Sequence, residues 1–218
     1  MTFLVIAPHT DDAELGAGAT IHRLIAEGHR VVVANLSDTQ NINGEIAGLT
    51  LRKEAKSASS LSGIRDEDLI FGDFPTRYFS LERQSILDFL IDIRKTIHPD
   101  VVIGPSIADT HQDHAVVAKE MQRAFRHSTN LGFDTYWNMT NQSVSMVLEV
   151  SRANLYSKVS ALAEFSSQSE RIYMKEGSVI SQAVMRGLPR GYEFAEAFSV
   201  DQISIPLRRP DAKVATHD

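Results

Sequence analysis

The chain of 218 residues contains no cysteine. It therefore has no disulfide framework, no thiolate nucleophile and no zinc or iron–sulfur site held by cysteine. Imidazole and carboxylate groups remain as the side-chain ligands for a metal ion, and the eight histidines and 28 acidic residues supply both kinds.

Long apolar runs and a positive net charge are also absent. No stretch approaches the roughly 18 consecutive apolar residues of a transmembrane helix, so we expect no membrane partner. The formal charge of −6 argues against a nucleic-acid backbone as the main partner. Residues 1–7 lack the basic segment that opens a signal peptide. We expect a cytoplasmic protein with one domain over residues 1–205 and a polar tail over residues 206–218.

Strand-like and helix-like segments alternate through the first half of the chain. Short apolar runs predict buried strands, and amphipathic stretches between them predict helices. The predicted strands are Phe3–Ala7, Val31–Leu36, Leu69–Phe71 and Val101–Ile103, and the predicted helices are Glu14–Glu27, Thr50–Leu61, Leu81–Ile97 and Ala115–Phe125. We interpret the polar residues 38–49 as a loop. This alternation predicts an α/β domain with a parallel sheet.

The second half is less regular and predicts additions to that domain. Thr135–Met139 and Val144–Val150 have the pattern of paired strands joined by a turn at Asn141-Gln142. Further along the chain, the pattern predicts helices over Tyr156–Phe165 and Glu170–Met185 and a last strand over Phe194–Val200.

Two clusters of ligand-type residues follow predicted strands. They are Pro8-His9-Thr10-Asp11-Asp12 and His111-Gln112-Asp113-His114. Because ligands of open parallel sheets bind beyond the carboxyl ends of the strands, we expect the fold to bring the clusters together. Two imidazoles and one carboxylate suit a catalytic zinc ion, and iron(II) shares this preference. A second carboxylate nearby can take a proton from the attacking water, so Asp11 and Asp12 could divide the two tasks.

Two simpler interpretations compete with this one. An Asp-Asp pair before a helix is often only an N-cap, although two clusters at strand ends favour a metal. Gly16-Ala17-Gly18, followed by Asp38 after the second strand, partly matches a dinucleotide-binding fingerprint. These glycines come too late after the strand, and Ile21 occupies the third glycine position, so we interpret them as small residues that let the helix pack closely on the sheet.

The two clusters resemble the motifs of a known family. Residues 7–16 with Gly18 look like the H-P-D-D-x-E-x-G motif of the PIG-L/LmbE-like zinc N-deacetylases, and His111–His114 matches their H-x-D-H motif. Arg52-Lys53-Glu54 and Ala195-Glu196-Ala197-Phe198 resemble the R-x-E and A-E-A-F elements. The resemblance implies a Rossmann-like, mostly parallel sheet flanked by helices, with a β-containing C-terminal extension. It also implies hydrolysis of an N-acetyl group.

The resemblance assigns roles to particular residues. It implies one zinc ion per chain with three ligands, His9, Asp12 and His114. Asp11 would be the general base that activates the water. His111, held by Asp113, would stabilise the oxyanion or protonate the departing amine. Arg52 would contact the substrate.

Three positions depart from the family pattern. Thr10 replaces a proline, and Phe165 stands where a histidine is expected. Phe194 stands where a tyrosine is common, so a hydroxyl is missing unless Tyr192 replaces it. These departures affect the identity of the substrate rather than the zinc chemistry. Trp137 could stack on a sugar ring, although a single aromatic residue in a strand is more often part of the core.

The sequence therefore predicts a zinc-dependent hydrolase that releases acetate from an N-acetylated amino sugar or sugar conjugate, free, nucleotide-linked or within a natural product. One alternative is a metal-dependent amidohydrolase for another acyl group or a non-sugar amide. The other is a non-catalytic sugar- or nucleotide-binding protein of the same fold. Assembly into a homo-oligomer is compatible with all three.

Overall fold

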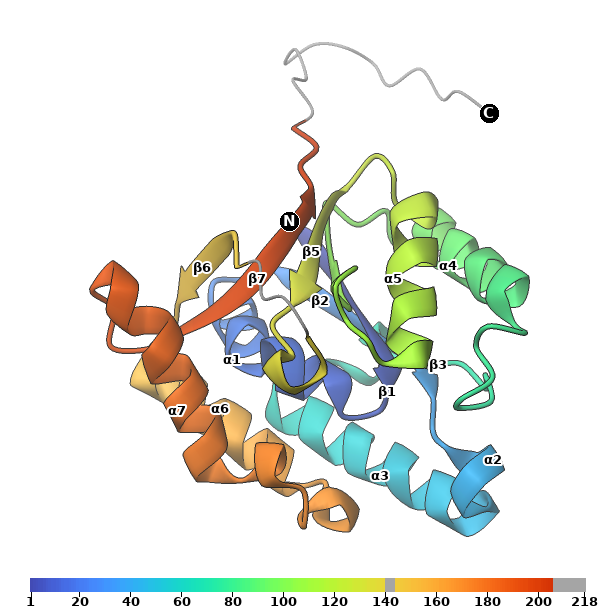
Figure 1. Ribbon diagram of the computed structural model, residues 1–218, viewed down its shortest axis with the longest axis horizontal. Helices are drawn as coiled ribbons and strands as arrows, with labels where there is room; N and C mark the ends of the chain where they lie inside the picture. Colours follow the sequence, from blue (N-terminus) through green and yellow to red (C-terminus); the bar gives the residue numbers. More distant parts are fainter. Residues whose placement is uncertain (140–143, 206–218) are drawn as a thin grey trace.

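The computed structural model describes residues 1–139 and 144–205, and these ranges contain a seven-stranded sheet with the order β3-β2-β1-β4-β5-β7-β6 (Figure 1). The strands are β1 (Thr2–His9), β2 (Arg30–Ser37), β3 (Leu69–Phe71), β4 (Val101–Gly104), β5 (Thr129–Phe133), β6 (Met146–Glu149) and β7 (Ala195–Gln202). The first five strands are parallel, and β7 runs antiparallel to both β5 and β6. This confirms the Rossmann-like α/β fold with a β-containing C-terminal extension.

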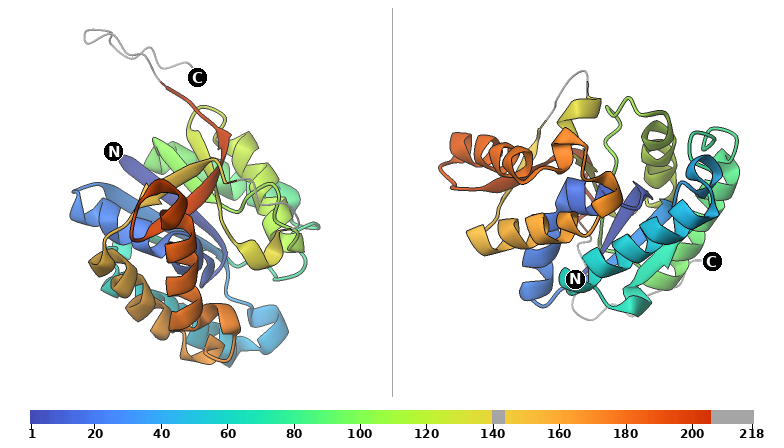
Figure 2. Two further views of the ribbon diagram at one scale, coloured as in Figure 1. Left: turned by 60° about the vertical axis from the view of Figure 1, so that its left-hand side comes forward. Right: turned by 90° about the horizontal axis from the view of Figure 1, so that it is seen from below.

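Helices cover both faces of the sheet. The α-helices are α1 (Asp12–Ala26), α2 (Gln40–Asn43), α3 (Glu45–Leu61), α4 (Arg83–Ile97), α5 (Gln112–Ala124), α6 (Arg152–Ala163) and α7 (Glu176–Gly187). Short 3-10 turns are η1 (Asp66–Asp68), η2 (Tyr136–Asn138), η3 (Ser166–Gln168), η4 (Ile172–Met174) and η5 (Leu188–Arg190). Figures 1 and 2 show α4 and α5 on one face, and α1 on the other with α3, α6 and α7 around it. None of the described helices combines the length and the apolar character that crossing a membrane requires.

The central strand β1 explains why its sequence is a continuous apolar run. Leu4 and Ile6 are fully buried in the cluster that joins the sheet to α4 and α5, while Val5 and Ala7 are fully buried against α1. Because alternate side chains of a strand point to opposite faces, a strand covered on both faces needs apolar residues at every position.

Helix α1 begins at Asp12, the last residue of the first ligand cluster, and packs unusually close to its neighbours. A Cβ atom on Gly16 would lie 2.4 Å from the ring of Phe133, and one on Gly18 would lie 2.8 Å from the side chain of Lys158. Close packing on the sheet is therefore confirmed for Gly16, because Phe133 belongs to β5, whereas Gly18 lets α1 pack closely on α6. Asp38, the acidic residue of the rival fingerprint, forms an ion pair with Arg52.

A buried ion pair stabilises a kink in α1. The helix leaves helical geometry at Ala17 (φ −147°), which frees backbone groups on both sides. The carboxylate of Glu196 accepts hydrogen bonds from the backbone N–H groups of Ala19 (3.2 Å) and Thr20 (2.7 Å) and from Lys158 Nζ (2.6 Å). Since buried backbone donors need partners, the A-E-A-F element supports the helix that begins at Asp12.

The predicted loop over residues 38–49 is wrong, because α2 lies there and α3 begins there at Glu45. Gly44, at φ 87°, separates the two helices. Thr50 is an interior helical residue whose hydroxyl donates to the carbonyl of Ile46 at 2.9 Å, and it does not cap the helix. These helical turns have exposed side chains, among them Ile46 and Leu49, so the segment lacks an amphipathic pattern that predicts a helix.

Two further differences affect the cavity described below. The predicted strand Thr135–Met139 is wrong, because Tyr136–Asn138 forms η2 and β6 pairs with β7 instead. The predicted helix Glu170–Met185 begins only at Glu176, after η4. Strand β5 was not predicted, since it starts with polar residues and contains a glycine. The predicted turn at Asn141-Gln142 and the predicted tail over residues 206–218 lie outside the described residues.

Candidate metal centre and active-site cavity

The two ligand clusters meet where the strand order reverses. β1 and β4 are neighbours, and the chain continues outward from them in opposite directions. The carboxyl ends of such a pair open into a crevice, which is the usual ligand site of an open α/β sheet. His9 is the last residue of β1, and His111 is the N-cap of α5, which follows β4. The predicted helix Ala115–Phe125 therefore starts three residues earlier than expected, and His114 lies in its first turn.

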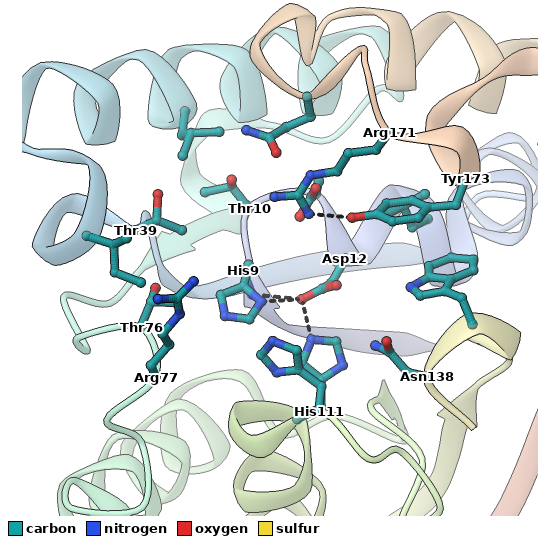
Figure 3. A pocket seen from close by; sticks show the side chains of 17 residues that line it. His9, Thr10, Asp12, Thr39, Thr76, Arg77, His111, Asn138, Arg171 and Tyr173 are labelled. Carbon is teal, nitrogen blue, oxygen red and sulfur yellow. Dashed lines mark hydrogen bonds and ion pairs between the residues drawn. The ribbon is translucent and has the colours of Figure 1, made fainter. Parts of the chain in front are cut away.

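Three side chains form a compact metal-ligand group. The Asp12 Oδ2 atom lies 3.3 Å from His9 Nδ1 and 3.2 Å from His114 Nε2. The three ligand atoms lie within 4.8 Å of one another, and Asp12 and His114 are buried. Figure 3 shows the carboxylate of Asp12 beside the ring of His9, with a dashed line between them.

A second layer of carboxylates orients the two imidazoles. His9 Nε2 lies 3.1 Å from Asp113 Oδ2, and His114 Nδ1 lies 2.8 Å from Asp109 Oδ2. Metal-binding histidines typically donate their other ring N–H to such a partner, which fixes the tautomer. The geometry therefore fits a divalent cation with two histidines and one carboxylate as its ligands. Asp113 contacts His111 through its backbone N–H, whereas its carboxylate contacts His9.

The charges around these rings favour a cation. Burial lowers the pKa of His9, but hydrogen bonds to Asp113 and Asp12 outweigh it and raise the pKa to about 9. Burial likewise lowers the pKa of His114, and the charge of Asp12 with the bond to Asp109 raises it to about 10. Both rings therefore lie in a strongly negative environment, which attracts a metal ion.

A second group that could hold a metal, His9 with His111 and Asp113, fits less well. Asp113 Oδ2 already accepts the backbone N–H of Arg77 at 2.8 Å, and Asp113 does not line the cavity. His111 Nδ1 accepts the backbone N–H of Asp113 at 3.3 Å. His9, Asp12 and His114 all line the cavity, so this trio is the better candidate.

Asp11 lies in the cavity wall beside the trio. It is the N-cap residue of α1, but its side chain accepts no capping hydrogen bond, so the simple N-cap interpretation does not explain it. Burial and the charge of Asp12 raise the pKa of its carboxyl. A carboxylate with a raised pKa can accept a proton, as a general base must.

His111 also lines the cavity, and its ring has a defined tautomer. Because Nδ1 accepts the backbone N–H of Asp113, the ring proton lies on Nε2. Burial and the charges of His114 and His9 lower the pKa of the ring. His111 can therefore act as a neutral hydrogen-bond donor through Nε2.

The cavity has a volume of about 290 Å³ and is lined by His9, Thr10, Asp11, Asp12, Leu15, Thr39, Ile42, Leu51, Thr76, Arg77, His111, His114, Trp137, Asn138, Gln168, Arg171 and Tyr173. Arg52 is not among these residues, because its guanidinium donates to Asp38, Asp73 and the carbonyl of Gly72. The structure therefore does not support Arg52 as a substrate contact. Tyr192 does not line the cavity either.

Asp109, Arg171 and Tyr173 are among the residues of this site that sequence reasoning missed. Asp109 Oδ1 accepts the backbone N–H of His111 at 2.8 Å, two residues further on. That turn is typical of aspartate, so its spacing before His111 was a usable signal. Arg171 and Tyr173 carried no signal, because they lie in a segment with a helical pattern.

Replacing Asp109 by asparagine is expected to weaken metal binding about 10- to 100-fold, because second-layer partners of metal-bound histidines contribute that much. The amide can still accept the N–H of His111, but an amide NH₂ toward His114 Nδ1 disfavours the tautomer that leaves Nε2 free. Competition with a chromophoric chelator measures the affinity, and the exposed Asp92→Asn is the matched control. An unchanged affinity would contradict the orienting role.

The matches to known proteins centre on this site. The family model described as PIG-L, GlcNAc-PI de-N-acetylase, matches residues 4–125, which include both ligand clusters. Diacetylchitobiose deacetylase of Thermococcus kodakarensis is 34% identical over 121 residues. This segment makes up 51% of the chain and 44% of that relative, so the chain matches less than half of the relative's length.

Solved structures resemble almost the whole chain. The conserved protein TT1542 from Thermus thermophilus has a TM-score of 0.77 at 22% identity, with 95% of this chain and 98% of that one covered. N,N'-diacetylchitobiose deacetylase from Pyrococcus horikoshii has a TM-score of 0.72 at 17% identity, with 91% of this chain and 83% of that one covered. GalB, the 4-carboxy-2-hydroxymuconate hydratase from Pseudomonas putida, has a TM-score of 0.74 at 18% identity, with 98% of this chain and 99% of that one covered. These likenesses show the fold.

Proposed function

Because the chain belongs to the PIG-L family, we propose that it is a zinc-dependent hydrolase that removes the N-acetyl group from an N-acetylated amino sugar or sugar conjugate. The products are acetate and a free amine. The observation that carries this proposal is the trio His9, Asp12 and His114 in a cavity wall that also presents Asp11.

The trio would hold one zinc ion per chain. When bound, such an ion supplies a Lewis acid that polarises the acetyl carbonyl and makes water more acidic. The same donors suit iron(II), so the native metal is a question for elemental analysis. Asp113 and Asp109 act here as positioning residues, since they orient the rings of His9 and His114.

Asp11 is the proposed general base. Its carboxylate takes a proton from water as the water oxygen forms a bond to the carbonyl carbon. When the C–N bond breaks, this proton is available to the departing amine nitrogen, so the hydrolysis balances. The raised pKa of Asp11 supports this role, because an ordinary carboxylate holds a proton too weakly at neutral pH.

His111 is the proposed hydrogen-bond donor to the reacting carbonyl. Negative charge develops on the carbonyl oxygen during the attack, and a donor already fixed in place stabilises that charge. The Nε2 proton of His111 suits this task, because the contact between Nδ1 and the backbone N–H of Asp113 sets the tautomer.

The family match ends at residue 125, before several of the residues that line the cavity. Trp137, Gln168, Arg171 and Tyr173 all lie beyond residue 125, so the relatives say least about the part of the cavity that selects the substrate. We treat residues 1–205 as one catalytic unit, since both ends of this range contribute to the cavity or support it. On the sequence argument above, the expected compartment is the cytoplasm.

A turnover screen tests the proposal. The zinc-loaded full chain is incubated with N-acetylglucosamine, N,N'-diacetylchitobiose, UDP-N-acetylglucosamine, N-propionylglucosamine and a non-sugar acetamide, and acetate and primary amine are measured. We expect equal amounts of both products from an N-acetyl sugar and loss of turnover after chelation. Turnover that survives metal removal, or no amine release from any substrate, would contradict it. Since a hydratase shares the fold, the fold alone does not select amide hydrolysis.

A further inference from the structure

The segment between α6 and α7 forms one wall of the cavity and is fixed in place by α3. The buried carboxylate of Glu54 accepts hydrogen bonds from the hydroxyl (2.6 Å) and backbone N–H (2.9 Å) of Ser167 and from the hydroxyl of Ser166 (2.9 Å). Figures 1 and 2 show this orange segment beside α3. Arg171 follows Ser167 closely in the chain, so the contacts with Glu54 help to hold Arg171 in the cavity wall.

Arg171 presents a guanidinium to the cavity, where the charges of Asp11 and Asp12 act on it from a distance and help to raise its pKa. It donates to the hydroxyl of Tyr173. Among the described residues, no carboxylate is close enough to form an ion pair with it. Arg52 is the opposite case, because Asp38 and Asp73 both bind it. A guanidinium has five N–H donors, so Arg171 keeps donors for a ligand.

A second unpaired guanidinium lines the same cavity. The backbone of Arg77 is held at φ 72° while its N–H donates to Asp113, and its carbonyl accepts from Gln112 at 3.3 Å. Its side chain is exposed and forms no ion pair among the described residues. Figure 3 shows both arginines among the side chains around His9. The cavity therefore carries positive charge near the metal-ligand trio.

We propose that the substrate carries an oxyanionic group, a carboxylate or a phosphate, besides its N-acyl group, and that Arg171 binds this oxyanion. The planar guanidinium fork matches the oxygens of either group and forms charge-assisted hydrogen bonds with them. Arg77 adds positive charge at the cavity wall. Beside Arg171, Tyr173 and Trp137 stack on each other at 4.6 Å and 5°, and this aromatic pair forms part of the cavity wall. This inference rests on the proposed function, because it names the substrate class of the same site.

Matched substrates test the inference in the zinc-loaded protein. N-acetylglucosamine is compared with N-acetylglucosamine 6-phosphate and with N-acetylmuramic acid, which carries a carboxylate, so the two arms distinguish the two oxyanions. We expect kcat/KM to be about 10- to 100-fold higher for at least one acidic substrate, as for one hydrogen-bonded charge. In Arg171→Gln this ratio falls toward one, and Arg171→Lys, which keeps the charge without the fork, is intermediate. Arg190→Gln, an exposed arginine outside the cavity, keeps the ratio.

Some results would overturn the inference. Acidic substrates that react no faster than the neutral sugar would do so. An Arg171→Gln variant that slows all substrates by the same factor would also do so. That pattern would mean that Arg171 acts through the charge interaction by which it lowers the pKa of Asp11. Circular dichroism and thermal midpoints establish that each variant is folded before it is compared.

A binding measurement keeps the inference independent of turnover. Trp137 is the single tryptophan of the chain and lines the cavity, so its fluorescence reports ligands there. The full chain, freed of metal so that no metal ion can bind phosphate, is titrated with N-acetylglucosamine 6-phosphate. We expect binding that weakens about 10- to 100-fold in Arg171→Gln. Binding that depends on Arg171 without any deacetylation contradicts only the proposed function, whereas deacetylation with no dependence on Arg171 contradicts only this inference.

Discussion

Replacing His114 by alanine is expected to remove the bound metal ion and to lower kcat/KM by about 10³-fold or more, since Lewis-acid catalysis contributes several kcal/mol. The reason lies in the geometry of the trio. His114 supplies one of three ligand atoms, and the remaining two belong to His9 and Asp12. The second possible metal group, His9 with His111 and Asp113, is a poorer replacement, because Asp113 Oδ2 already accepts the backbone N–H of Arg77.

Elemental analysis of the purified variant and steady-state kinetics measure the two effects together. His127→Ala is the matched control, because His127 is an exposed histidine that does not line the cavity. We expect that control to keep its metal and its activity. A full metal content in the His114→Ala protein would disprove the proposed ligand set.

Replacing Asp11 by asparagine is expected to lower kcat by about 10² to 10⁴-fold, the usual contribution of a general base. The amide has nearly the shape of the carboxylate but cannot accept the proton from water. Metal content should stay unchanged, because Asp11 is not part of the ligand trio.

The neighbouring aspartate provides the sharpest control for this experiment. Asp12 Oδ2 contacts both histidine rings and also accepts the backbone N–H of His9 at 2.8 Å. Asp12→Asn should therefore lose metal affinity as well as turnover, whereas Asp11→Asn should lose turnover alone. If both variants kept the metal, or if Asp11→Asn kept near-native turnover, the division of tasks between the two residues would be wrong.

The parts of the fold that could be predicted are those whose pattern reflects local burial. The strand Leu69–Phe71 has the predicted bounds, and the helix ending at Ile97 stops before Pro99 as expected. The exposed turns over residues 40–49 and strand β5 were missed. These segments lack a periodic apolar pattern. The turns are exposed to solvent, and in β5 a glycine, Gly132, allows a close approach to the backbone of Ser106.

The same division holds at the candidate site. The sequence by itself determined the kinds of ligand available, because it lacks cysteine and places both clusters directly after strands. It also placed Asp11 and Asp12 side by side, and the resemblance assigned their separate roles.

Only the tertiary structure decided how the side chains are partnered. It pairs Asp113 with His9, ties Arg52 to Asp38 and brings Arg171 to the cavity. These contacts join segments far apart in the chain, and they depend on how helices pack on the sheet. Local spacing determines which residues follow a strand, whereas packing determines which distant side chain meets them.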